Sequence, residues 1–265
     1  MRKIHKVWLA GAETKIGQAF LKSIDQRIVN TLSTDIEDVD VSVIDEALAY
    51  SYLNQPDAII NCYDFNDIDE CEKNPEKAYK MNAIVARNLA ICSRKIGARF
   101  VHISTDSVFG EEREKPYTEF DVPNPINVYG RSKVEGENFI KDLGQKYFIV
   151  RTGYVYDAEH HYVDKNYDIR RKICPTSASE LAKFIIMLMN TPEYGVYHAH
   201  SKGYCTYLEF IHEVMNHSND KIEINKENEN DSFKNIKLDE FMLRISNLYE
   251  FPTWEEDLLN NIKVK

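Results

Sequence analysis

The fold of this chain is indicated most directly by residues 7–17, which read Val7-Trp8-Leu9-Ala10-Gly11-Ala12-Glu13-Thr14-Lys15-Ile16-Gly17. An apolar run leads into a glycine turn, and the turn leads into a segment with helical spacing. Gly11 suits a tight turn, and Gly17 lets the helix pack closely on the preceding strand. The free N–H groups at the start of such a helix attract a pyrophosphate. The segment predicts either a dinucleotide site or an ordinary turn of a sheet protein.

Apolar strands and helices continue to alternate outward from this turn. Strands are expected at 6–10, 27–32, 58–62, 99–104 and 147–151, and helices at 15–24, 41–53, 76–96, 128–143 and 179–189. Near-continuous apolar strands between helices are typical of a parallel sheet that is covered on both faces. The chain is therefore expected to be an α/β protein with a Rossmann-type, doubly wound parallel sheet.

The pattern changes after Tyr194. A short strand at 196–199, a helix at 206–215, a polar loop with one short strand at 221–231 and short helices at 239–245 and 254–262 are expected. These elements suggest a small α+β lobe packed against the main sheet. We expect residues 1–194 to form a dinucleotide-binding domain, in which 157–174 is a short insertion toward the substrate lobe. Residues 195–265 are expected to form a small substrate-binding lobe, with a cleft between the two parts.

The composition argues against several classes of binding partner. With 265 residues, of which 43% are hydrophobic, the chain can bury a sizeable core. A formal net charge of −10 argues against nucleic acid or an anionic membrane as the main partner. No apolar stretch is long enough to span a bilayer. The five cysteines lack metal-ligand spacing and no H-E-x-x-H pattern occurs, which predicts reduced thiols in a cytoplasmic protein and no metal site of His or Cys ligands. Whether Mg²⁺ takes part is left open.

A possible chemistry is indicated by Ser104-Thr105-Asp106 at the end of an expected strand, followed by Tyr129 and Lys133. Ligands of open α/β sheets bind at that edge. Tyr129 and Lys133 are four residues apart, so they share one face of a helix. A nearby ammonium lowers the pKa of a phenol from about 10, and such a tyrosine can protonate a carbonyl oxygen. Thr105 can bind the same oxygen, and Lys133 can hold ribose hydroxyls. The alternative is a chance pair on a solvated helix face.

Longer stretches of the chain match one known family. The most specific stretch is Val101-His102-Ile103-Ser104-Thr105-Asp106-Ser107-Val108-Phe109. Others are Pro56-Asp57-Ala58-Ile59-Ile60-Asn61, Tyr129-Gly130-Arg131-Ser132-Lys133-Val134-Glu135-Gly136-Glu137 and Arg151-Thr152-Gly153-Tyr154-Val155-Tyr156. Over most of its length the chain resembles the extended short-chain dehydrogenases/reductases, and within them the dTDP-4-dehydrorhamnose reductases.

The resemblance implies reduction of a 4-keto nucleotide sugar by NADPH or NADH. Tyr129 is then the proton donor, Lys133 its partner and Thr105 the ligand of the substrate oxygen. Substrate contacts are implied for Thr105, Asp106, Tyr129 and Tyr154. Cofactor contacts are implied for Gly11, Ala12, Thr14, Lys15, Ile16, Gly17, Asp40, Val41, Cys62, Tyr63 and Lys133. Whether the chain forms a homodimer is left open.

Three features depart from the family pattern. Thr14 stands where the family has a middle glycine, and Cys62-Tyr63 replaces small residues beside the cofactor. The segment 157–174 is short and charged, and it ends in a basic cluster, residues 170–172, that either meets a diphosphate or forms a solvated face. These departures favour, as an alternative, a non-catalytic regulatory or scaffolding member of the family with impaired cofactor or substrate binding. A third hypothesis is an enzyme that acts on a smaller substrate.

The cofactor preference is left open by the sequence. The second expected strand ends at Thr31-Leu32-Ser33-Thr34, where no acid is placed to select a ribose 2′-hydroxyl and no arginine to bind a 2′-phosphate.

Overall fold

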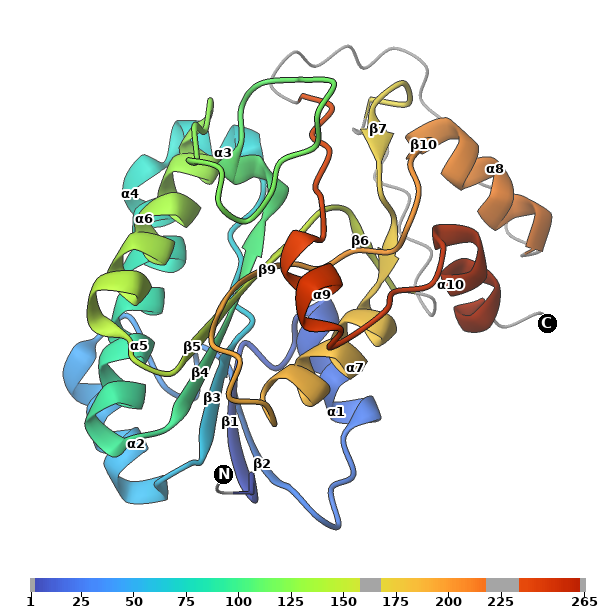
Figure 1. Ribbon diagram of the computed structural model, residues 1–265. Coiled ribbons are helices and arrows are strands. Elements are labelled where there is room, and N and C mark those ends of the chain that lie inside the picture. Colours follow the sequence, from blue (N-terminus) through green and yellow to red (C-terminus); the bar gives the residue numbers. More distant parts are fainter. Residues whose placement is uncertain (1–2, 158–167, 218–233, 263–265) are drawn as a thin grey trace.

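The computed structural model describes residues 3–157, 168–217 and 234–262. Within these ranges, six parallel strands form the main sheet in the order β2-β1-β3-β4-β5-β9 (Figure 1). The strands are β1 (Lys6–Ala10), β2 (Asn30–Thr34), β3 (Ala58–Asn61), β4 (Arg99–Thr105), β5 (Tyr147–Thr152) and β9 (Gly195–His198). The strand order turns back between β1 and β3, and ligands of such sheets bind outside the carboxyl ends of the strands at that point. The expected Rossmann-type fold is confirmed.

Helices cover both faces of this sheet, as Figure 1 shows. One face carries α1 (Lys15–Ser23) and α7 (Ala178–Leu188), and the other carries α2 (Ile44–Asn54), α5 (Val85–Ile96) and α6 (Val128–Leu143). Successive residues of β1 alternate between two buried clusters, because side chains of a strand point to opposite faces. Val7 and Leu9 belong to the cluster under α1 and α7, whereas Trp8 belongs to the cluster under α2 and α5.

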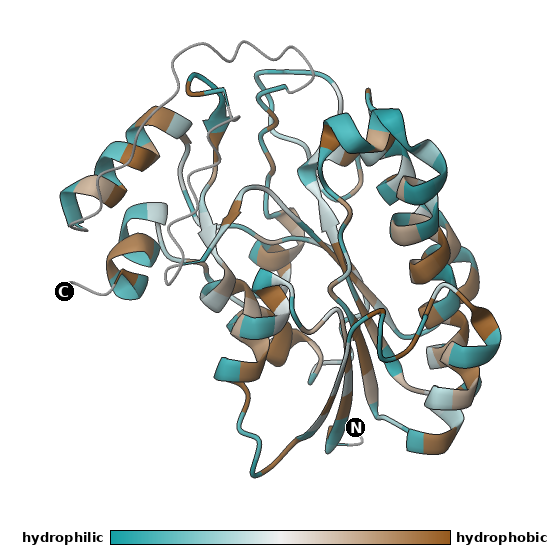
Figure 2. Ribbon diagram, turned by 180° about the vertical axis from the view of Figure 1, so that it is seen from behind, coloured by the Kyte–Doolittle hydropathy of each residue, from teal (hydrophilic) through white to brown (hydrophobic). Residues whose placement is uncertain are grey.

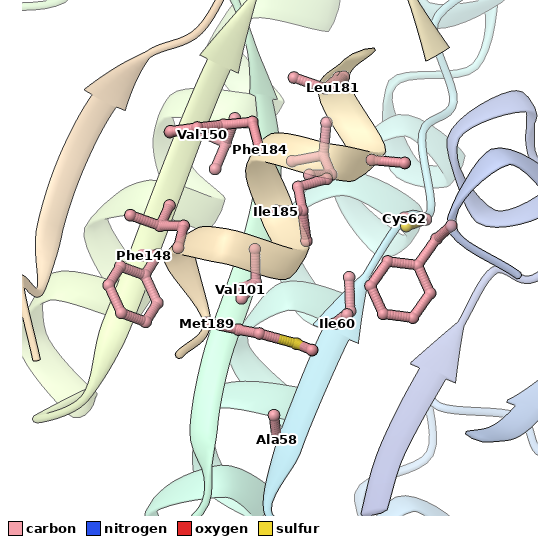
Figure 3. Close-up of a cluster of buried hydrophobic side chains, with 14 of the residues drawn as sticks. Ala58, Ile60, Cys62, Val101, Phe148, Val150, Leu181, Phe184, Ile185 and Met189 are labelled. Atoms are coloured by element: carbon pink, nitrogen blue, oxygen red, sulfur yellow. The ribbon is translucent and has the colours of Figure 1, made fainter. Parts of the chain in front are cut away.

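On one face of the sheet, side chains of α7 pack on the strands and form part of the hydrophobic core. Leu181, Phe184 and Ile185 lie over Val101 of β4 and Val150 of β5 (Figure 3). Figure 2 shows that the strands are largely hydrophobic and that the covering helices combine hydrophobic with hydrophilic residues. This amphipathic pattern is the reason that the helices pack on the sheet.

A smaller part, formed by two short sheets and two helices in the described residues, packs beside α7. β7 (Lys172–Ile173) pairs with β10 (Cys205–Thr206), and β6 (Val155–Tyr156) pairs with β8 (Thr176–Ser177). Two helices, α8 (Tyr207–His217) and α10 (Trp254–Asn261), bury Phe210 and Trp254 with them. Two elements after residue 194 contact the main sheet instead. β9 pairs with β5, and α9 (Phe241–Ser246) contributes Leu243 to the core beneath α1 and α7.

Strand β2 begins three residues later than the sequence suggested. Asp25 organises a turn in which its carbonyl oxygen accepts the N–H groups of Ile28 and Val29, and its side chain accepts that of Arg27. Residues 27–29 are therefore unavailable to the sheet, and the strand extends to Thr34. The expectation of a strand at 27–32 was wrong at both ends.

The long helix expected at 76–96 is divided into three parts. It consists of α4 (Pro75–Tyr79), a π-helical turn η1 (Lys80–Ile84) and α5. It is preceded by α3 (Ile68–Lys73), which the sequence did not indicate because six residues are too few for a helical period. A π-turn inside a helix frequently marks a functional segment, and this one lies against α6.

Parts of the expectations fall outside the described residues. These are the polar stretch at 221–231 and most of the segment 157–174. Within residues 3–157, 168–217 and 234–262, no helix has both the length and the apolar character needed to cross a membrane. All five cysteines are buried and unpaired.

Candidate active site

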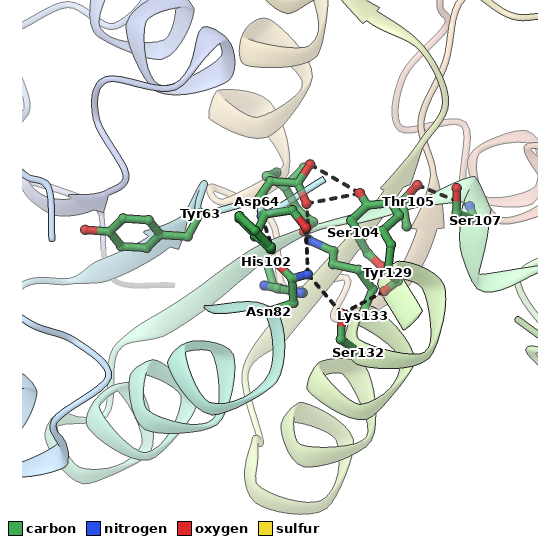
Figure 4. A network of polar contacts seen from close by, with 12 residues as sticks. Tyr63, Asp64, Asn82, His102, Ser104, Thr105, Ser107, Tyr129, Ser132 and Lys133 are labelled. Carbon is green, nitrogen blue, oxygen red and sulfur yellow. Dashed lines mark hydrogen bonds and ion pairs between the residues drawn. The ribbon is translucent and has the colours of Figure 1, made fainter. Parts of the chain in front are cut away.

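Tyr129 and Lys133 lie in the first two turns of α6, beside Thr105 at the carboxyl end of β4 (Figure 4). Asp64, from the loop after β3, lies between them. The Tyr129 hydroxyl donates to the Asp64 carboxylate, at 3.0 Å from Oδ1 and 3.2 Å from Oδ2. Lys133 Nζ is 3.3 Å from the same Oδ1 and donates to the Ile103 carbonyl oxygen at 2.7 Å. The tyrosine and the lysine were predicted from the sequence, whereas the aspartate that joins them was not.

The environment of Tyr129 keeps its phenol protonated. Burial raises the pKa of Tyr129 well above its usual range, and the negative charge of Asp64 raises it further, while a contact with the Thr105 side chain lowers it. From the sequence we expected Lys133 to lower this pKa, and that expectation was wrong, because burial and Asp64 raise it. In the structure the Asp64 carboxylate lies against both groups and offsets the charge of the lysine. A protonated phenol is the form that can donate a proton.

The N-terminus of α6 is held by neighbouring elements. The Asn127 side chain accepts the Gly130 N–H at 2.8 Å and caps the helix. The Val128 N–H donates to the Glu72 carboxylate of α3 at 2.7 Å. These bonds satisfy two of the N–H groups that a helix start leaves without partners, and they fix the position of Tyr129.

Asn82 in the π-turn joins α6 to the loop that carries Asp64. Its amide nitrogen donates to the Ser132 hydroxyl at 2.9 Å and to the Phe65 carbonyl at 3.0 Å, and its oxygen accepts the Phe65 N–H at 2.9 Å. Both backbone groups of Phe65 are therefore bound by one buried side chain. The residue next to Asp64 is fixed relative to α6.

A buried ion pair lies deeper along α6. Arg151 of β5 donates to both oxygens of Glu137, at 2.9 and 2.6 Å, and the Ser104 hydroxyl donates to Oε1 at 2.7 Å. Although burial opposes ionisation, the charge and hydrogen bonds of Arg151 lower the pKa of Glu137 to about 2. The pair ties α6 to β4 and β5, the two strands beneath Tyr129.

The glycine turn follows β1 at the same edge of the sheet. Gly11 has φ +83°, and a Cβ on Gly17 would lie 2.5 Å from the Gly11 carbonyl oxygen, so close packing of α1 requires a glycine there. Thr14 has φ −66°, which a β-branched residue adopts readily. Its hydroxyl donates to the Gly11 carbonyl at 2.8 Å and accepts the Gly17 N–H at 3.1 Å. Thr14 is thus a helix cap within the turn.

The remaining residues of the turn differ in exposure. Ala12 is buried, Ile16 packs against the core under α1 and α7, and Lys15 is exposed at the start of α1. Their contacts with a cofactor stay predictions.

Cys62 and Tyr63 are both buried after β3. The Tyr63 ring points away from the Tyr129 network (Figure 4) and packs in the cluster that contains Trp8. Burial, together with the negative charge of Asp35, raises its pKa. The ring therefore occupies space between the glycine turn and the end of β2.

Asp40 and Val41 lie in the loop before α2. Hydrogen bonds from Ser42 lower the pKa of Asp40, and the Val41 carbonyl accepts the Asn88 amide at 3.0 Å. Val41 itself is fully buried. Their roles toward an adenosine stay predictions.

Asp35 is an acid at the sheet edge that was not predicted from the sequence. It follows β2 directly, at the carboxyl end of the strand, and its carboxylate accepts the Glu13 N–H at 3.1 Å. The acid was overlooked because the strand was expected to end at 32, which placed Asp35 beyond the edge. Residue 35 is 18 positions after Gly17, about the spacing at which Rossmann proteins place the acid that binds a ribose.

The two arginines of the basic cluster at 170–172 lie in different environments. Arg170 is exposed and pairs with Asp168 at 3.2 Å, whereas the Arg171 side chain is 10% exposed and lies 4.0 Å from Asp106. Arg171 also lines a pocket with Ser107, Asn127 and Lys234. One arginine of the predicted cluster therefore faces the region beside Thr105.

Tyr154 packs against the smaller part of the molecule. Its ring lies 5.5 Å from that of Tyr207 and 5.7 Å from that of Phe210, centroid to centroid. The preceding Gly153 lies beside Asp106. The role of Tyr154 in substrate binding stays a prediction. In the part of the chain that the structure describes, no group of three or more His, Cys, Asp or Glu side chains is placed to hold a metal ion.

Comparison with known proteins identifies the family of the chain. A family model described as the RmlD substrate binding domain matches residues 5–263. The chain belongs to this family. The crystal structure of dTDP-4-dehydrorhamnose reductase from Bacillus anthracis in complex with NADP is 30% identical, with a TM-score of 0.89 and coverage of 98% of each chain. The crystal structure of a dTDP-4-dehydrorhamnose reductase from Clostridium acetobutylicum is also 30% identical, with a TM-score of 0.89, over 97% of this chain and 98% of that one.

The curated relatives of this RmlD family member match over a smaller share of the chain. The spore coat polysaccharide biosynthesis protein SpsK of Bacillus subtilis is 36% identical over 176 residues, which are 62% of each chain. The dTDP-4-dehydrorhamnose reductase of Aggregatibacter actinomycetemcomitans is 27% identical over 73% of this chain and 72% of its own length. The chain therefore spans less than two thirds of the first of these relatives.

Proposed function

We propose that this RmlD family member reduces the 4-keto group of a nucleotide sugar with a nicotinamide cofactor, and that Tyr129 donates the proton. The observation that supports this most is the position of the Tyr129 hydroxyl at the carboxyl edge of the sheet, beside Thr105 and Lys133. Proton donation by a positioned side chain is an effective form of acid catalysis of carbonyl reduction. The similarity to dTDP-4-dehydrorhamnose reductases supports the same reaction.

The residues at the edge of the sheet fit a dinucleotide. The turn from Gly11 to Gly17 precedes the α1 N-terminus, where backbone N–H groups suit a pyrophosphate. In this proposal Lys133 holds ribose hydroxyls, and a reduced nicotinamide, when bound, supplies the hydride. Thr105 orients the carbonyl oxygen, and Tyr129 transfers its hydroxyl proton to that oxygen.

Asp35 supports a preference for NADH. A carboxylate at the end of β2 accepts a hydrogen bond from a ribose 2′-hydroxyl and repels a 2′-phosphate. Glu37 and Asp38 follow in the same turn and add negative charge. We expect calorimetric titration to give tighter binding of NADH than of NADPH, with the difference reduced in Asp35→Ala. Tighter binding of NADPH to the unchanged chain contradicts this preference.

A pocket that Ser107 lines, two residues after Thr105, supports an anionic substrate. Arg171 and Lys234 supply positive charge there, and Ser107 and Asn127 supply polar groups. The pocket is small, and its charged groups suit contact with phosphate oxygens, which guanidinium groups bind in pairs.

The experiment is to follow cofactor absorbance with a dTDP-linked 4-keto-6-deoxy sugar and, separately, with a free keto sugar. We expect oxidation of the reduced cofactor with the nucleotide-linked sugar and a much smaller rate with the free sugar. Equal rates favour an enzyme of smaller substrates. Cofactor binding without turnover favours the non-catalytic alternative, for which the pairing of Lys133 with Asp64 is the supporting observation.

A further inference from the structure

We propose that Asp64 is a proton-relay residue that returns a proton from solvent to Tyr129 after each turnover. This inference rests on the proposed function, in which Tyr129 loses its hydroxyl proton to a carbonyl oxygen. It assigns a role to a side chain that belongs neither to the glycine turn nor to α6.

The first support is the contact itself. Both carboxylate oxygens of Asp64 are within 3.2 Å of the Tyr129 hydroxyl, which is hydrogen-bonding distance. A proton received on either oxygen is thus next to the phenolate that the reaction leaves. Transfer of a proton from a carboxylic acid to a phenolate is favourable, because a phenolate is the stronger base.

The second support is the path to solvent. The Tyr129 residue is 6% exposed and the Lys133 side chain 1%, whereas the Asp64 side chain is 30% exposed. Among these three groups, Asp64 is the one that reaches water. The step is balanced: the Tyr129 phenolate takes the proton from the Asp64 carboxylic acid, and the carboxylate then takes a proton from solvent. No other reactant is needed.

The third support is that Asp64 is held in place. The next residue, Phe65, has its N–H and its carbonyl bound by the buried Asn82 side chain. Asn82 is in turn bound to Ser132, which lies between Tyr129 and Lys133 on α6. A fixed donor and acceptor pair is what fast proton transfer requires.

The charged and titratable groups around this contact come from three elements. Lys133 and Tyr129 belong to α6, Cys71 belongs to α3, and Asp106 follows β4 on the far side of the phenol. The Asp64 charge raises the pKa of both Cys71 and Tyr129. Neutralising Asp64 therefore removes one of the two negative charges, Asp64 and Asp106, that raise the pKa of the phenol, and the phenolate becomes easier to form.

The first test is a titration that needs neither cofactor nor substrate. Tyrosinate absorbance is measured against pH for the unchanged chain and for Asp64→Asn, and again with Tyr129→Phe in each background to isolate residue 129. We expect Tyr129 to ionise at lower pH in Asp64→Asn. Asp69→Asn, a matched loss of charge on the exposed side of α3, is expected to leave the titration unchanged. An unchanged Tyr129 titration in Asp64→Asn overturns the proposal.

The second test separates the relay from simple positioning. In single-turnover mixing, Asp64→Asn and Asp64→Ala are expected to complete the first hydride transfer, because Tyr129 starts protonated. In steady state they are expected to be at least about tenfold slower, with Asp64→Glu restoring most of the rate and added acetate accelerating Asp64→Ala. Equal steady-state rates for the unchanged chain and Asp64→Asn overturn the relay. If the unchanged chain shows no turnover while the titration shifts, the proposed function fails, and the relay fails with it.

Discussion

At the scale of single residues, Thr14 shows how a departure from a family pattern can be absorbed. A middle glycine suits a turn that requires positive φ, but Thr14 lies at φ −66° and requires none. Its hydroxyl donates to the Gly11 carbonyl and accepts the Gly17 N–H, so it closes the turn and starts the helix. This could not be predicted from the sequence, because spacing alone does not give the backbone angles of a turn.

Thr14→Ala is expected to lower the free energy of unfolding by about 1 kcal/mol, which is the usual cost of losing a helix N-cap. Urea denaturation measures the change. Thr14→Ser keeps the hydroxyl and is expected to lose much less. A Thr14→Ala chain as stable as the original would show that the cap contributes nothing.

Asp64 and Asp35 mark the limit of sequence prediction at this scale. Tyr129, Lys133 and Thr105 could be identified because their residue types and spacing are specific. Asp64 could not, because it lies 65 positions before Tyr129 and meets it only through the packing of a loop on α6. Asp35 could have been predicted from the sequence, but the end of the strand was placed two residues too early, so Asp35 was not expected at the sheet edge.

At the scale of elements, α6 was predicted with its observed bounds, 128–143. Asn127 caps its start and Gly144 follows its end, and both signals are local. β2 was predicted too early because the turn around Asp25 depends on side-chain hydrogen bonds that apolar spacing does not report. The π-turn before α5 was also missed, since it depends on how Asn82 packs against α6.

Glu137→Gln is expected to destabilise the chain near neutral pH and less so in acid. The folded pKa of Glu137 is about 2, below its usual 4.5. Its ionised form therefore contributes stability above pH 4.5, about 3 kcal/mol, and this contribution is lost as the pH falls toward 2. The free energy of unfolding of both chains is measured from pH 7 to pH 3. A difference that stays constant over this range contradicts the ion-pair account.

At the scale of the whole molecule, the smaller part is joined to the main sheet by a buried carboxylate. Asp257 of α10 accepts the Ser177 N–H at 2.6 Å, the Ser177 hydroxyl at 2.7 Å and the Ser201 hydroxyl at 3.0 Å. Ser177 caps α7, which covers the sheet, and Ser201 follows β9. The general architecture could be predicted from alternating apolar segments, whereas this connection joins residues 80 positions apart and depends on tertiary packing.

Asp257→Ala is expected to lower the free energy of unfolding by about 3 kcal/mol, because hydrogen bonds to a buried carboxylate are lost and the Ser177 N–H keeps no partner in its place. Chemical denaturation measures the loss. Glu255→Gln, on the exposed side of the same helix, is the control and is expected to have little effect. Equal losses for the two variants would contradict a specific role for Asp257.

The most direct test of the proposed reductase is Tyr129→Phe. The substitution removes the hydroxyl and keeps the ring that α6 buries. Oxidation of the reduced cofactor by a dTDP-linked 4-keto sugar is compared between the two chains, with cofactor affinity measured in parallel. We predict a rate lower by about 10²-fold or more with nearly unchanged cofactor affinity. A Tyr129→Phe chain that reduces the sugar at the original rate would contradict the account.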